Sequence, residues 1–78
     1  MSVETQVIWS LPSIPDNVAV IDAKAQELIA QGKEIGNAVI VRTETQVIVN
    51  RFWVDTATAE EWIAFVLSYN PISAAIIP

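Results

Sequence analysis

Apolar and polar residues alternate near the start of the chain, over residues 3–11. One side of this run carries Val3, Thr5, Val7, Trp9 and Leu11, and the other side carries Glu4, Gln6, Ile8 and Ser10. A repeat of two residues places successive side chains on opposite faces, so the run predicts a half-buried strand. The next stretch, PSIPD, holds two prolines, which cannot donate to a strand ladder, and we expect the strand to end there.

The spacing of apolar residues then changes to that of a helix. Asp16 is a suitable N-cap for a helix that extends to about Gln31. Its buried stripe is predicted to hold Val18, Ile21, Ala25, Leu28 and Ile29. Val20 falls outside this stripe and is expected to point outward. The stretch GKEIGN contains both glycines of the chain and is expected to end the helix and turn the backbone.

Two β-rich runs follow, residues 37–42 and 45–54, and they predict a hairpin. Its turn has no Asn-Gly or Asp-Gly pair, so the pattern leaves the register open. The stretch TAEE, residues 58–61, matches a capping box for a second helix, although a start nearer Asp55 or Thr56 is also compatible. The Asn-Pro pair at residues 70–71 ends that helix, and the apolar run 72–77 is typical of an edge strand.

The stretch ETQVI occurs twice, at residues 4–8 and 44–48, and each copy opens a β-α-β unit. We therefore predict one α+β domain over residues 1–78, a ferredoxin-like βαββαβ plait with an antiparallel sheet and two helices on one face. The usual strand order of that fold places the two ETQVI strands side by side in the centre of the sheet.

Such a plait leaves one sheet face without a helix, and Ile8, Ile48 and Phe52 are expected to point from it. Trp62, Phe65, Val66 and Tyr69 already complete the buried stripe of the second helix. Ile63 and Leu67 form a further apolar stripe on the same helix, which the tail 72–77 or a second subunit would cover. Exposed apolar patches of this kind mark interaction sites. We expect Ile8, Ile48, Phe52, Ile63 and Leu67 to form the interface of a homo-oligomer, most simply a homodimer.

The composition supports this expectation. The 78 residues are 53% hydrophobic and 17% charged, against about 45–50% and 25% in ordinary domains. Cysteine and histidine are absent, which removes disulfides, the usual transition-metal ligands and the commonest general base. We therefore expect no metal site, no cofactor, and no Ser–His or Cys–His catalysis. Oligomerisation is the remaining support for a domain of this size.

The net charge of −5 and the wide separation of the four cations disfavour nucleic acid and anionic membrane surfaces as partners. No apolar run is long enough to cross a membrane, and the N-terminal residues lack the pattern of an export signal. The sequence thus predicts a soluble, cytoplasmic protein.

The string VNRFW is the strongest candidate for a ligand site. Asn50, Arg51 and Trp53, together with Trp9, could line a small pocket that combines aromatic rings with polar groups. The alternative is structural, with Trp9 and Trp53 in the core and Arg51 paired with an acid at the sheet edge.

The run VIVNRFWVDTATAEEWIAFV, residues 47–66, resembles the second half of dimeric α/β-barrel proteins, which include the antibiotic-biosynthesis monooxygenase-like domains. The resemblance implies that two plaits pack their open sheet faces together. It also implies an activity found in some members, oxidation of aromatic polyketides without a metal or bound cofactor. The tail WIAFVLSYNPISAAIIP in addition resembles small phage or marine microbial proteins, which implies no activity.

The sequence favours a non-enzymatic, homo-oligomeric structural or interaction module. One alternative is a small-ligand-binding or cofactor-independent oxygenase-type domain that uses Trp9, Asn50, Arg51 and Trp53. Another is regulatory small-molecule binding at a dimer interface, which rests on analogy of fold alone.

Overall fold

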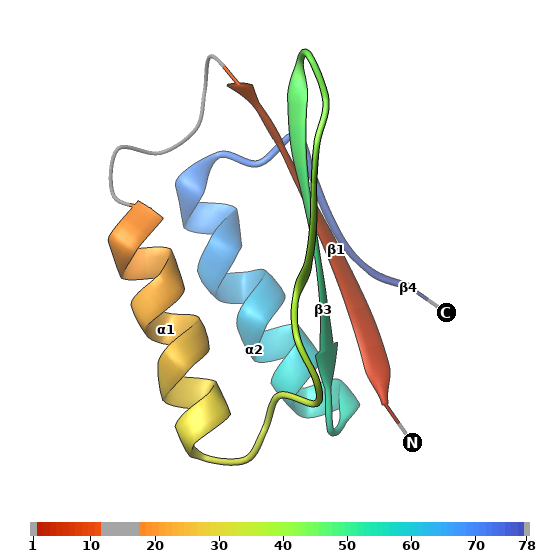
Figure 1. The fold of residues 1–78 in the computed structure, drawn as a ribbon. Helices are drawn as coiled ribbons and strands as arrows, with labels where there is room; N and C mark the ends of the chain where they lie inside the picture. The colour runs from red at the N-terminus through yellow and green to blue at the C-terminus, as the bar shows by residue number, and fades with distance from the viewer. Residues whose placement is uncertain (1, 12–17, 78) are drawn as a thin grey trace.

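The computed structural model describes residues 2–11 and 18–77, which form a four-stranded antiparallel sheet with two helices on one face (Figure 1). Along the chain the elements are β1 (Val3–Ser10), α1 (Val18–Ala30), β2 (Val39–Arg42), β3 (Gln46–Trp53), α2 (Thr56–Val66), a 3-10 turn (Leu67–Tyr69) and β4 (Ser73–Ile77). The strand order across the sheet is β2-β3-β1-β4. The two ETQVI strands are therefore central neighbours, and the predicted hairpin and edge strand are confirmed.

The register of β1 against β3 decides which side chains face the helices. Val7 pairs with Val49, and Thr5 pairs with Arg51. Side chains of directly paired residues lie on the same face of a sheet. The buried residues of β1 are Thr5, Val7 and Trp9, so their partners on β3 also face the helices, as the alternation predicts.

The core is built around two tryptophans between the sheet and α2. Trp53 is 0% exposed and Trp62 is 1% exposed, and their ring centroids lie 5.3 Å apart. The indole nitrogen of Trp53 donates to Oγ1 of Thr5 at 2.9 Å, which satisfies both buried polar groups. Each large aromatic side chain removes much apolar surface from water, so a small domain can form a core from few residues.

Helix α1 buries Ile21, Ala25 and Leu28, which recur at helical spacing, and Val20 is exposed as predicted. Ile29 was expected in this stripe but is 41% exposed, because it lies about 100° round the helix from Leu28. The predicted cap at Asp16 lies outside the described residues. The helix ends at Ala30, and Gly32 with φ of +72° turns the chain, as glycine there allows.

Helix α2 begins at Thr56, with Asp55 as its N-cap. The Asp55 carboxylate accepts from the backbone nitrogen of Thr58 at 2.8 Å and from Oγ1 of Thr58 at 2.7 Å. The expected cap at Thr58 is therefore wrong, and the earlier start is the one observed. The physical reason is that Asp55 is extended and its carboxylate reaches the third helical residue, which places Thr58 inside the first turn.

Strand β4 lies on the edge beside β1, and the backbone nitrogen of Ile72 donates to the carbonyl of Ile8 at 2.7 Å. On α2, Ile63 packs partly buried against the core, whereas Leu67 is 57% exposed. The tail therefore does not cover Leu67, contrary to one of the two expectations. The other expectation, that a second subunit covers it, stays a prediction.

We predict that Asp55→Ala lowers the melting temperature by several degrees, because the first turn of α2 loses its cap. Asp55→Asn keeps a capping side chain and should melt close to the unchanged protein. The two bonds from Thr58 lower the pKa of Asp55 from its ordinary 3.8, so the carboxylate stabilises the fold above that pH. Its contribution is lost as the pH falls through the lower, folded value. Equal melting of the alanine variant and the unchanged protein at pH 7 would contradict this cap.

Candidate functional site

The open sheet face is the candidate interaction surface. Ile48 of β3 pairs with Ile8 of β1 on one side and with Val41 of β2 on the other. These three apolar side chains therefore form one row across the sheet. Ile8 and Ile48 are partly buried by their neighbours, and Val41 is 48% exposed. Phe52 lies on the same face nearer the other end of β3. A row of this kind has no helix above it, because both helices lie on the opposite face (Figure 1).

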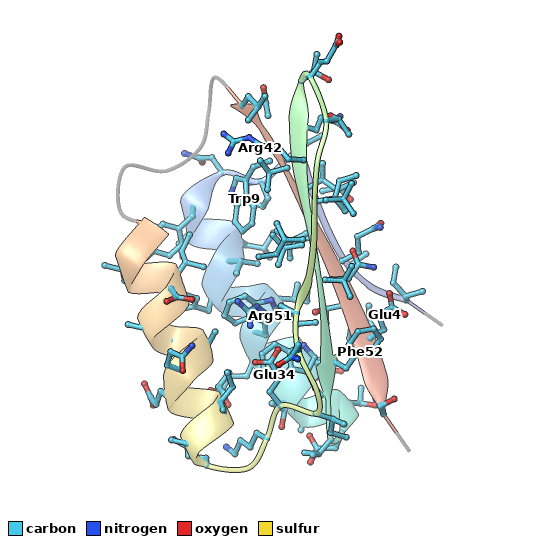
Figure 2. All side chains as sticks on the ribbon, in the orientation of Figure 1. Glu4, Trp9, Glu34, Arg42, Arg51 and Phe52 are labelled. Atoms are coloured by element: carbon cyan, nitrogen blue, oxygen red, sulfur yellow. The ribbon has the colours of Figure 1, made fainter. Side chains whose placement is uncertain are left out.

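A polar contact separates the two apolar parts of this face. The side-chain amide nitrogen of Asn50 donates to Oε2 of Glu4 at 2.6 Å, across from β3 to β1. Figure 2 shows Glu4 and Phe52 on the side of the sheet that faces away from the helices. The bond engages the amide and the carboxylate with each other. The apolar row lies between two polar pairs of the same face, Gln6 with Asn50 and Ser10 with Gln46.

Strand β2 is exposed along its whole length, on both faces and at its edge. The exposed fractions are 51% for Val39, 63% for Ile40 and 48% for Val41, and Arg42 is exposed as well. Ile40 pairs with Val49 and so lies on the helix side of the sheet. It stays exposed there, which shows that neither described helix covers this edge. The run VIV is thus an apolar strand with its backbone edge open to solvent.

The other face holds a buried ion pair. Nη1 of Arg51 lies 3.1 Å from both carboxylate oxygens of Glu34, and the two side chains are 11% and 1% exposed. Glu34 is held here because its segment forms a short antiparallel bridge with Trp53. The guanidinium carbon of Arg51 also lies 5.1 Å from the centre of the Trp62 ring, a cation–π contact. The charge of Arg51 is therefore compensated from two directions inside the protein.

Two donors in this cluster have no acceptor among the described residues. These are Nε of Arg51 and the indole nitrogen of Trp62, both fully shielded from solvent. A buried donor without an acceptor costs about 1–3 kcal/mol. Each of these two groups lacks an acceptor in the helix-side cluster.

The structure does not bring the four predicted pocket residues together. Trp9, Arg51 and Trp53 face the helices, whereas Asn50 lies on the open face, because it is adjacent to Arg51 in a strand. The indole nitrogen of Trp9 donates to the carbonyl of Tyr69 at 3.1 Å, and Trp53 donates to Thr5. The structural interpretation of these residues thus agrees with the contacts, including the acid partner of Arg51.

A second ion pair joins the two helices at the surface. Nζ of Lys24 lies 2.9 Å from Oε2 of Glu61, and this contact raises the pKa of Lys24 and lowers that of Glu61. The ammonium of Lys24 also lies 5.9 Å from the centre of the Phe65 ring. Surface pairs contribute little, so we expect this one to add little to the stability of the fold.

Two features of these surfaces were not anticipated from the sequence. The partner of Arg51 was expected to be an acid, but Glu34 was not identified, since it lies 17 residues away in a glycine-flanked turn. The exposure of β2 was also missed. Its signal is the unbroken apolar run VIV, where a strand with one buried face would alternate.

No protein-family model, curated protein or solved structure matches this chain. Within residues 2–11 and 18–77, no three acidic, histidine or cysteine side chains gather where they could hold a metal ion. None of the helices that the structure describes is long and apolar enough to cross a membrane.

We predict that Glu34→Ala unfolds about half of the protein or more. The change leaves the Arg51 charge buried without its carboxylate, which costs about 3–5 kcal/mol. That is as large as the roughly 3–5 kcal/mol that a core of this size supplies. The double variant Glu34→Met with Arg51→Met removes both charges and should regain most of the lost stability. Urea unfolding followed by tryptophan fluorescence measures both, and an unchanged midpoint for Glu34→Ala would show that the pair contributes nothing.

Proposed function

We propose that this protein is a non-enzymatic, homo-oligomeric interaction module in which a second copy covers the open sheet face. The observation that carries the proposal is the apolar row Val41, Ile48 and Ile8 on a face that neither described helix covers. Exposed apolar surface is stabilised when a partner removes it from water. The non-enzymatic part is supported by the internal use of the polar groups of Trp9, Asn50, Arg51 and Trp53.

The fold proposed to carry this function is the ferredoxin-like βαββαβ plait. The order of elements, the central pairing of β1 with β3 and the placement of both helices on one face support it. The resemblance of residues 47–66 to dimeric α/β-barrel proteins suggests how the copies meet. Two plaits would pack their open faces together and turn two half-covered sheets into one closed core.

The five predicted interface residues do not share one surface. Ile8, Ile48 and Phe52 belong to the open sheet face, whereas Ile63 and Leu67 belong to α2 in the helix layer. A face-to-face dimer would therefore cover the first three and leave Leu67 exposed. The proposed contact is the sheet face, and Leu67 takes part only if a further copy meets the helix layer.

We predict that Ile48→Lys raises the dissociation constant of the oligomer by at least about tenfold. Each copy would lose an apolar side chain whose burial contributes roughly 1.5–3 kcal/mol. Ile29→Lys is the matched control, because Ile29 is 41% exposed on α1 and faces away from the proposed contact. Sedimentation equilibrium measures both constants. A wild-type protein that is monomeric at all concentrations, or equal effects of the two variants, would contradict the proposal.

A second candidate function, binding of a small ligand, is favoured by the two buried donors of Arg51 and Trp62. A ligand oxygen that reaches either group would satisfy a donor that otherwise lacks an acceptor. If this function holds, one member of a broad library of aromatic and carboxylate compounds should raise the melting temperature. At 100 times its dissociation constant such a ligand adds about 2.7 kcal/mol of stability. Arg51→Met with Glu34→Met should abolish the shift, and a library without any stabilising compound argues against a ligand.

A further inference from the structure

Strand β2 has an unused backbone edge whose orientation follows from the hairpin. The backbone nitrogen of Thr43 donates to the carbonyl of Gln46 at 2.9 Å, so this pair is bonded across β2 and β3. Bonded and non-bonded pairs alternate along an antiparallel ladder. The pairs of Val41 and Val39 with β3 are therefore bonded, and the backbone groups of Ile40 and Arg42 point outward to the free edge.

The sequence of this edge is self-complementary. Val39, Ile40 and Val41 read the same in both directions, so an antiparallel copy placed about a two-fold axis at Ile40 matches like with like. Ile40 then lies opposite Ile40 of the second copy, and Val39 lies opposite Val41. The same register places each Arg42 opposite Ala38, which keeps the two guanidinium groups apart. In a two-fold contact residue i meets residue j and residue j meets residue i. At this axis the three central pairs are all apolar and β-branched, and no like charges meet.

The two edges of the sheet differ in their protection. Prolines stand on either side of β4 in the sequence, at positions 71 and 78, and proline hinders strand addition. Strand β2 contains no proline, and its one charged residue, Arg42, stands at its end. Lone edge strands in monomers are usually protected by charges, prolines or bulges. Here the central three residues of the edge are β-branched and apolar.

From these observations we propose that β2 pairs antiparallel with β2 of a second copy, about a two-fold axis at Ile40, and joins two sheets into one of eight strands. The outward amide and carbonyl of Ile40 bond to those of Ile40 of the second copy. The row Val41, Ile48 and Ile8 then continues into Val39 of the second copy on the same face. This inference takes from the proposed function only that the chain associates with itself.

Strand β2 is short, and stable interfaces bury about 1,200–2,000 Å². The edge contact is therefore weak by itself and depends on protein concentration. The net charge of −5 on each copy opposes association at low salt, so moderate salt strengthens the contact.

A charge swap at residue 40 tests both the contact and its register. Ile40→Lys and Ile40→Glu each place like charges opposite each other across the proposed axis, so each variant alone should associate more weakly than the unchanged protein. An equimolar mixture places Lys opposite Glu and should associate at least about fivefold more tightly than either variant alone. The same pair of changes at Ile29, on α1, is the control and should show no gain on mixing. Sedimentation equilibrium at one total concentration measures all samples.

A second variant, Ile40→Pro, tests the backbone contact. The amide of Ile40 faces the free edge, so proline there leaves the β2–β3 bonds intact and removes the donor that the second copy needs. The expected result is an unchanged circular dichroism spectrum with loss of the edge contact.

The outcomes separate this inference from the proposed function. If the mixture behaves as its components do while Ile48→Lys still dissociates the oligomer, the edge inference is overturned and the face contact stands. If the mixture gains affinity while Ile48→Lys has no effect, the edge contact stands and the face contact is overturned. A protein that never associates overturns both.

Discussion

Strands β1 and β3 pair along their full lengths in the centre of the sheet, and the register of this pairing positions most other contacts. With Val7 opposite Val49, the residues Thr5 and Arg51 face the helices together. A shift by one residue would turn the core face of either strand to solvent. It would also separate Trp53 from Thr5, whose hydroxyl oxygen accepts the bond from the indole. The register of β1 against β3 thus determines both which side chains enter the core and which lie on the open face.

The contacts near the Trp53 end of this pairing explain why a small chain buries an ion pair. Trp53 and Trp62 fill the space between the sheet and α2, and Arg51 enters the same layer because it stands two residues before Trp53. A buried guanidinium without a partner would be strongly destabilising. The turn after α1 supplies Glu34, and the Trp62 ring supplies a second favourable contact. The ion pair therefore adds a side-chain contact to the backbone bridge that already joins this turn to β3.

The order of strands and helices could be predicted because each depends on local patterns. The alternation in residues 3–11 indicated the first strand, and the Asn-Pro pair marked the end of the second helix. The placement of β1 beside β3 was predicted from the usual strand order of a βαββαβ plait, which the echo of ETQVI had suggested. The cap of α2 was ambiguous because Asp55 and Thr58 are both good capping residues, and only backbone geometry distinguishes them. The pocket predicted from Asn50, Arg51 and Trp53 ignored that adjacent strand residues face opposite sides. The partner of Arg51 could not be found, since a contact over 17 residues depends on how a turn packs.

The two proposed contacts have different consequences for assembly. An edge contact about a two-fold axis uses β2 of both copies, so it closes on itself and leaves only the two β4 edges, which prolines flank in the sequence. A face contact about another two-fold axis likewise closes after two copies. One contact alone gives a dimer, and both together link four copies into a closed group if the two axes are perpendicular and intersect. If the axes do not intersect, the same contacts repeat without closing, and the assembly grows into a filament. The two proposed contacts share a residue. Val41 belongs to the edge strand β2 and also to the apolar row on the open sheet face. A second copy at the edge would extend the apolar row by its Val39, which pairs with Asn50. The face contact would then have a larger apolar surface to cover, so under the proposal each contact would favour the other.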